Sequence, residues 1–386
     1  MTILDTLPIE LVHKILELAQ PVDVASFAQS NRTFRSLVYG SPNQQLWKEL
    51  FLAEPLWDDP RECVTPCGEF LAQSNSEYEF DWKGEVKRRT RARTLVNGKD
   101  LLLGAERAKP GELRDTLQTL ISMIVNVPPS PPSFNRNWVK EVLGQGIFLD
   151  TCSVTDPVLS DRLAQLHTYF GLTLQDADRK RQAESRGFIY DLRNYTSASN
   201  WGPYLPDGTG RVNWAHVRAV HQDMAMHSIM FDNYGDTHLR LWYNNSALLP
   251  NGSRDISPFR SKDFVEVPRD IECKFTVTHI VPDAHHPLRP KIHFKGSVQG
   301  MEVIVGHVEL TKHHDVRWHF RSSAATEFLW SSEGIQIGAV RSEYGVLGTW
   351  TTVSHDDDDP VGPFWLRKKH ILREELPKLP DVHLQW

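Results

Sequence analysis

Apolar residues close to the N-terminus recur at the spacing of a short amphipathic helix. Leu11, Ile15 and Leu18 share one stripe, and Pro8 stands where a first helical turn would begin, because its missing N–H has no intrahelical partner to lose there. Two further short patterns follow, so three short helices are predicted before the polar segment at 40–45. Helices of this length cannot bury all of their apolar side chains among themselves. We therefore expect some of these side chains to face another protein or the rest of the chain.

Helical spacing continues through the middle of the chain. Apolar stripes predict helices at 113–124, 158–170 and 214–224, and a stiff, extended loop is expected at the Pro-rich segment 127–133. The segment 81–93 is strongly basic, which is typical of a nuclear-localisation or nucleic-acid patch. The intervals of its Trp, Glu and Thr residues favour instead a packed helix whose Lys and Arg side chains reach into water.

From about residue 270 the hydrophobic period changes from that of a helix to two. Apolar residues alternate at 271–277, and again at 308–310 and 316–320 on either side of a short polar connection, which predicts a hairpin. Segments 335–338 and 346–351 add further strand signals. Several short strands in series without helices between them predict an antiparallel sheet.

These patterns together predict an α+β fold in three parts. An N-terminal three-helix unit occupies 1–52, a mainly helical linker region occupies 53–186, and a β-rich domain, barrel-like or sandwich, occupies 187–386. A chain of 386 residues is long enough for two or three such parts with a large core.

Composition narrows the range of partners. A net charge of -6 does not support binding to nucleic acid, which usually requires a basic balance. No stretch approaches the length of uninterrupted apolar sequence that spans a membrane, and the first residues do not resemble a signal peptide. Four cysteines in this length do not form a disulfide framework. We expect a chain that works in the cytoplasm or the nucleus, without nucleic-acid or membrane partners.

No segment carries a catalytic signature. The sequence has no glycine-rich phosphate loop, no Gly-x-Ser-x-Gly elbow and no His-Glu-x-x-His helix. Cys63 and Cys67 could supply two zinc ligands, but their flanking segment offers no other Cys or His. His313 and His314 are neighbours in a predicted turn, where adjacent side chains diverge. We therefore expect no enzyme activity, no metal site and no cofactor.

The N-terminal residues resemble an F-box, the motif that docks a substrate receptor onto the adaptor subunit of an SCF-type ubiquitin ligase. The match includes, in order, Leu7-Pro8, Glu10, Ile15-Leu16, Pro21, Asp23, Asn31-Arg32, Phe34-Arg35 and Leu46-Trp47. Ala19, Ala25 and Ser30 depart from it, since the family usually places larger apolar residues there. The alternative is a helical cap that only packs on the body. The resemblance implies that adaptor binding, or the local fold that permits it, depends on Leu7, Pro8, Ile9, Leu11, Ile15, Leu16, Val24, Phe27, Phe34, Leu37 and Trp47.

Three later blocks resemble segments of a large group of fungal F-box proteins. They lie at 190–195, 202–205 and 330–365, and the resemblance transfers no chemistry to individual residues. Large aromatic residues in the last block either close a barrel core or line a recognition pocket. The candidate substrate-binding residues are Trp330, Trp350, Phe364 and Trp365.

The sequence thus predicts a non-catalytic substrate-recognition subunit of an SCF-type ubiquitin ligase. Its F-box would bind the adaptor and through it the cullin, and its β-rich domain would hold an unknown protein substrate. The alternative is a binding protein outside the ligase system, with a small-molecule or peptide pocket in the β-rich domain.

Overall fold

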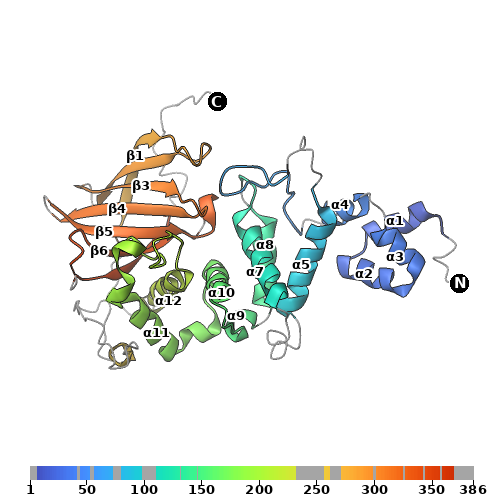
Figure 1. The fold of residues 1–386 in the computed structure, drawn as a ribbon, viewed down its shortest axis with the longest axis horizontal. Coiled ribbons are helices and arrows are strands. Elements are labelled where there is room, and N and C mark those ends of the chain that lie inside the picture. The colour runs from blue at the N-terminus through green and yellow to red at the C-terminus, as the bar shows by residue number, and fades with distance from the viewer. Residues whose placement is uncertain are drawn as a thin grey trace.

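The structure is a computed structural model, and helices lead from its N-terminus to a sheet at the opposite end (Figure 1). The predicted α+β class is confirmed. The residues that the structure describes are 7–40, 44–52, 56–72, 80–97, 110–130, 132–145, 147–231, 256–260, 271–298, 301–324, 327–341, 344–356 and 359–368.

The predicted N-terminal helices are confirmed, and a fourth follows them. Their bounds are α1 (Ile9–Glu17), α2 (Pro21–Ser30), α3 (Arg32–Tyr39) and α4 (Gln45–Leu52). Local chemistry fixes where they start. Pro8 and Pro21 occupy N-terminal positions that need no backbone N–H, and the Asn31 side chain accepts the backbone N–H of Phe34 at 2.8 Å as the N-cap of α3.

The middle of the chain is a layer of helices. The longer ones are α5 (Trp82–Asn97), α7 (Pro110–Val125), α8 (Phe134–Gly144), α10 (Pro157–Phe170), α11 (Arg179–Ile189) and α12 (Trp214–Phe231). Short turns of helix are α9 (Phe148–Thr151), α13 (Ser257–Arg260), η2 (Leu174–Ala177), η3 (Leu192–Asn194), η4 (Ser197–Ser199) and η5 (Ala339–Arg341). The basic segment is the packed helix that its spacing favoured, since Trp82 and Val86 of α5 are buried.

The boundary predicted at residue 187 does not coincide with the change from helices to strands. Helix α11 spans this boundary, and α12 and α13 lie beyond it. The first strand begins at Cys273, close to residue 270, where the change to a period of two was predicted. The physical reason is that α12 packs directly on strands β6 and β7. Its buried residues Trp214, Val217 and Val220 therefore join the helical layer to the sheet.

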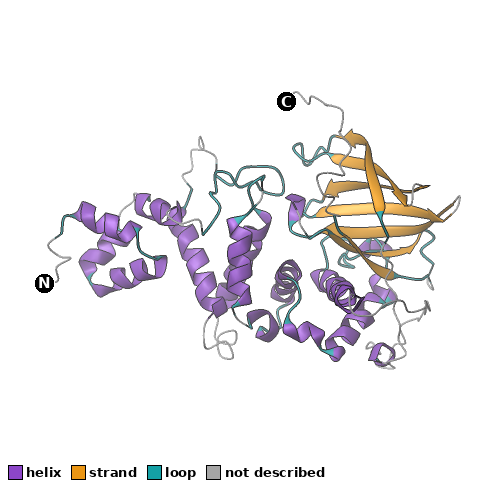
Figure 2. Cartoon of the chain, turned by 180° about the vertical axis from the view of Figure 1, so that it is seen from behind, coloured by secondary structure: helices purple, strands orange, loops and turns teal. Residues whose placement is uncertain are grey.

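One seven-stranded sheet follows, in which every strand pairs antiparallel with the next along the chain. The strands are β1 (Cys273–Val281), β2 (Lys291–Val298), β3 (Met301–Leu310), β4 (Val316–Ala324), β5 (Glu327–Gln336), β6 (Val346–Thr352) and β7 (Gly362–Leu366). The predicted hairpin is β3–β4. Within the described residues there is no second sheet to complete a sandwich, and helices cover one face instead (Figure 2).

The main hydrophobic core is continuous from the N-terminal helices to the sheet. It begins with residues such as Val12 and Leu16, runs through the helical layer and ends at Ile335 and Leu347 on β5 and β6. Buried Arg136 on α8 strengthens this connection, because its guanidinium donates to the carbonyls of Ile124 at 3.1 Å and Gly338 at 3.0 Å. The N-terminal helices and the sheet are thus joined by packed side chains.

A smaller core lies on the opposite face of the sheet. Phe294, Ile304 and Phe320 are buried there, and Phe364 of β7 contacts Phe320 with 5.4 Å between ring centroids. The sheet is therefore apolar on both faces over part of its area. This explains why its strands contain apolar runs as well as strict alternation.

Two of the blocks that resemble segments of fungal F-box proteins, 202–205 and 330–365, meet at one seam between the helical layer and the sheet. A Cβ on Gly202 would lie only 2.4 Å from the Cβ of Glu333, so this approach requires glycine. Trp201 stacks on His355 with ring centroids 4.4 Å apart, and the Arg317 guanidinium lies 5.7 Å from the Tyr204 ring centroid. Packing between the helical layer and the sheet therefore explains the residue types at these positions.

Candidate functional site

Helix α1 exposes a row of apolar side chains that the other described residues leave uncovered. Leu11, Ile15 and Leu18 are 51%, 49% and 88% exposed, and their spacing places them on one side of the helix. We call these three residues the docking stripe. Val12 and Leu16 face the core and are 4% and 3% exposed. An uncovered apolar row beside a packed one is typical of a protein-binding surface.

The residues predicted to carry adaptor binding divide into three groups by exposure. Those on the surface are Pro8, Ile9, Leu11 and Ile15, and Leu7, Phe27 and Leu37 are half-buried. Leu16, Val24, Phe34 and Trp47 are buried. In the buried group Phe34 stacks on Phe27 with 4.1 Å between ring centroids, and the Trp47 indole N–H donates to the Val38 carbonyl at 3.2 Å. These contacts hold the helices together.

The three positions that depart from the F-box pattern carry small side chains. Ala19 and Ala25 are half-buried, and Ser30 is exposed. The Ser30 hydroxyl donates to the Phe27 carbonyl at 2.6 Å, at the end of α2. Ala19, Ala25 and Ser30 offer less apolar contact area than larger residues would. The helices form although these larger residues are missing.

A buried polar network fixes the N-terminal helices to the helical layer. The Asp58 carboxylate accepts hydrogen bonds at the start of α8 from the Ser133 hydroxyl at 2.6 Å and from the Phe134 N–H at 2.8 Å. The Asn135 side-chain oxygen in turn accepts from the Asp58 N–H at 3.1 Å and from Arg89 at 2.9 Å. Segment 57–58, α5 and α8 are thereby joined through satisfied polar groups.

Arg89 is the centre of that network. It is 2% exposed, donates to Glu85 at 2.8 Å, and its guanidinium lies 4.7 Å from the Phe51 ring centroid and 5.2 Å from that of Trp57. Burial alone would raise the pKa of Glu85, but Arg89 and Arg88 outweigh burial and lower that pKa. Burial lowers the pKa of Arg89, but a guanidinium stays protonated in proteins, so the pair stays charged. Phe51 at the end of α4 packs on the Arg89 guanidinium.

The four candidate substrate-binding aromatics do not form one site. Trp330 and Trp350 are half-buried and contact each other with ring centroids 5.0 Å apart, whereas Phe364 belongs to the small core with Phe320. Trp365 points to the opposite face and packs against the main core, where its indole N–H donates to the Tyr344 carbonyl at 2.7 Å. Only the Trp330–Trp350 pair remains as a candidate recognition surface.

Strand register brings four scattered histidines into a row. His279, His293, His307 and His319 lie directly opposite one another on β1 to β4, and the row ends at buried Glu333 on β5. The His319 ring lies 2.7 Å from a Glu333 oxygen. Burial and its neighbours His279 and His307 lower the pKa of His293. The row is a polar strip beside the helix-covered strands, and the sequence does not reveal it without the register.

The opposite face carries a pocket of about 330 Å³ near the β1 end of the sheet. Aromatic and aliphatic side chains dominate its lining, including Phe275, Phe294, Val308 and Trp318. Its size is at the lower end for small-molecule sites. An apolar side chain of a bound peptide would fit it as well.

Comparison with known proteins places a domain at the N-terminus. Residues 4–44 match the family model of the F-box domain, a segment that includes α1, α2 and α3, so the predicted F-box is confirmed there. No curated protein and no solved structure matches the chain. F-box domains bind the adaptor of SCF-type ligases and through it the cullin. In the described part of the chain no helix is long and apolar enough to cross a membrane.

Proposed function

We propose that this chain is a substrate-recognition subunit of an SCF-type ubiquitin ligase. The observation that carries the proposal is an F-box domain whose first helix leaves the docking stripe uncovered. The adaptor would cover Leu11, Ile15 and Leu18, while Leu16, Val24, Phe34 and Trp47 maintain the fold that presents them. The resemblance of later blocks to fungal F-box proteins supports the same assignment. The chain would act in the cytoplasm or the nucleus.

Such a subunit performs no bond chemistry itself. It raises the effective concentration of substrate lysines near the charged ubiquitin-conjugating enzyme, and this effect depends on a fixed distance between the two ends. The continuous core and the Arg89 network supply that rigidity. We infer that they position the sheet, at the far end of the molecule from α1 (Figure 1), relative to the adaptor.

The sheet is the part of the chain that we propose holds the protein substrate. Trp330 and Trp350 offer a half-exposed aromatic pair of the kind enriched in binding hot spots. The pocket lined by Phe275 and Trp318 offers a place for one apolar side chain. The same pocket favours the second candidate function, a small-molecule or peptide carrier that works without the ligase.

Reconstitution separates the two functions. Full-length chain mixed with purified adaptor and cullin is expected to elute from size exclusion as a single complex with one copy of each, as measured by light scattering. The physical reason is that the apolar docking stripe is buried only in the complex. A chain that circular dichroism shows to be folded, but that elutes apart from the adaptor, would contradict the proposal and favour the carrier.

A further inference from the structure

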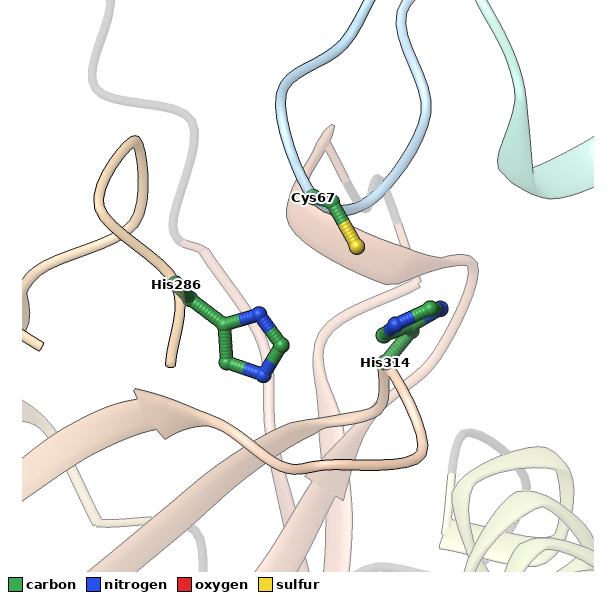
Figure 3. Close-up of side chains that lie close together, drawn as sticks. All are labelled: Cys67, His286 and His314. Atoms are coloured by element: carbon green, nitrogen blue, oxygen red, sulfur yellow. The ribbon is translucent and has the colours of Figure 1, made fainter. Parts of the chain in front are cut away.

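We propose that Cys67, His286 and His314 form a binding site for a divalent cation that prefers thiolate and imidazole ligands, and that Zn²⁺ is the ion that fits it. One ligand atom from each side chain lies within 4.8 Å of the others, and Figure 3 shows the three side chains converging from separate segments. Cys67 comes from the loop at 56–72, His286 from the β1–β2 connection and His314 from the β3–β4 turn.

The loop that carries Cys67 is held against the sheet. The Arg289 side chain donates to the Pro66 carbonyl at 2.9 Å, which connects the β1–β2 segment directly to the residue before Cys67. The next residue, Gly68, has φ of +98° and donates its N–H to the Thr65 carbonyl at 2.9 Å, a turn that glycine adopts without strain. The Cys67 thiol is thus placed by a defined turn and not by a free loop.

The ring of His286 has one nitrogen engaged and one left for a ligand. Its Nε2 lies 3.0 Å from the Thr311 carbonyl oxygen. Because a carbonyl can only accept, Nε2 carries the hydrogen and Nδ1 keeps its lone pair. Metal-binding histidines are commonly oriented in this way, by donating the other ring N–H to a carbonyl or carboxylate. This hydrogen bond is therefore an observation in favour of a ligand, independent of the distances.

His314 completes the group because of the conformation of the β3–β4 turn. Its backbone has φ of +67°, and its N–H donates to the Thr311 carbonyl at 2.9 Å. Thr311 thereby orders both histidines. The neighbouring His313 points elsewhere, with Nε2 3.1 Å from the Thr209 carbonyl. The divergence expected of adjacent turn residues thus occurs, and only one of the two joins the group.

The donor set selects the type of ion. Sulfur and imidazole nitrogen are ligands for Zn²⁺, whereas Ca²⁺ and Mg²⁺ require oxygen. Bonds to Zn²⁺ of roughly 2.0–2.3 Å place tetrahedral ligand atoms about 3.3–3.8 Å apart, so the side chains would close by about 1 Å on binding. His314 is exposed and is free to make this adjustment. Three protein ligands leave a fourth position for water or a group from another molecule.

A bound ion would cross-link the loop after α4 to two turns of the sheet. Such a link adds to the rigid connection between the N-terminal helices and the sheet, because Cys67 precedes both histidines by more than 200 residues in the chain. Metal binding to the folded chain alone also stabilises it by mass action.

Cobalt binding provides the test, because Co²⁺ coordinated by thiolate gives a charge-transfer absorption band that Zn²⁺ then displaces. Metal-free full-length chain is expected to bind one equivalent of Co²⁺ with this band. Cys67→Ser should abolish the band, and His314→Ala should weaken Co²⁺ binding at least about 10-fold, since even partners of the ligands contribute about 10- to 100-fold. Cys273→Ser and His313→Ala serve as controls. Both variants should keep the absorption band and the Co²⁺ affinity of the natural chain.

A second readout separates loss of the site from loss of the fold. Zn²⁺ is expected to raise the Tm of the natural chain and of His313→Ala, and to leave that of Cys67→Ser unchanged. Absence of the cobalt band in the folded natural chain would overturn the proposal. So would a band or a Zn²⁺-dependent Tm increase that persists in Cys67→Ser.

Discussion

Replacing both Leu11 and Ile15 with Asp is expected to weaken adaptor binding by about 100-fold or more, while the chain stays folded. Both side chains are about half exposed in the free chain, so charge there costs little before binding. Central apolar residues of an interface contribute on the order of 2 kcal/mol each when they are hot spots, and burying a carboxylate against the adaptor adds a desolvation cost. Calorimetric titration of purified adaptor into the full-length chain measures the effect.

Two comparisons show whether the loss is specific. Leu174→Asp places the same charge on an exposed leucine outside the F-box and should bind the adaptor normally. Leu16→Ala removes a buried side chain from the other side of α1 and should instead lower the free energy of unfolding by about 2–5 kcal/mol. Normal adaptor affinity in the Leu11→Asp, Ile15→Asp double variant would show that the docking stripe is wrongly assigned.

Arg89→Met is expected to lower the free energy of unfolding by about 3–5 kcal/mol, the cost of breaking a buried ion pair by removing one partner. The change leaves the Glu85 carboxylate without its buried cation, removes a donor to Asn135 and takes the guanidinium from the Phe51 ring. Urea unfolding followed by circular dichroism measures it.

Arg88→Met is the matched control for Arg89. It also removes a partner of Glu85, but the Arg88 side chain is half exposed, so the expected cost is below about 1 kcal/mol. Replacing Glu85 with Leu together with Arg89→Met should recover part of the loss, because the carboxylate no longer lacks a partner. Equal destabilisation by Arg88→Met and Arg89→Met would contradict the assignment of Arg89 as the centre of the buried polar network.

Much of the fold follows from local signals in the sequence. The first helices could be predicted because Pro8, Pro21 and Asn31 mark their starts. The β3–β4 hairpin could be predicted because its polar turn separates two alternating runs. The side of α1 that stays uncovered could not be predicted, because the helix is apolar on both sides. The outcome depends on packing of α1 against α4, a contact between segments about 30 residues apart.

The remaining features depend on distant contacts. The predicted β-rich domain begins at residue 187, although the period of two begins only near residue 270. The residues between include α12, which packs on β6 and β7, and Gly202, which lies against Glu333. The histidine row needs the register of four strands. Cys67, His286 and His314 share no motif spacing at all. The Thr311 carbonyl orders the two histidines, and the contact of Arg289 with Pro66 brings the Cys67 loop to them.

We propose that this one chain connects a ligase adaptor at its F-box to a protein held on its sheet. The most direct measurement is the abundance of ubiquitin-modified lysines in cells whose natural chain is replaced by the Leu11→Asp, Ile15→Asp double variant or by Trp330→Ala, Trp350→Ala, with the proteasome inhibited. We expect the same proteins to lose modified lysines in both lines while each variant accumulates as folded chain. If the modified lysines persist in both lines, the chain does not connect the adaptor to a protein on its sheet.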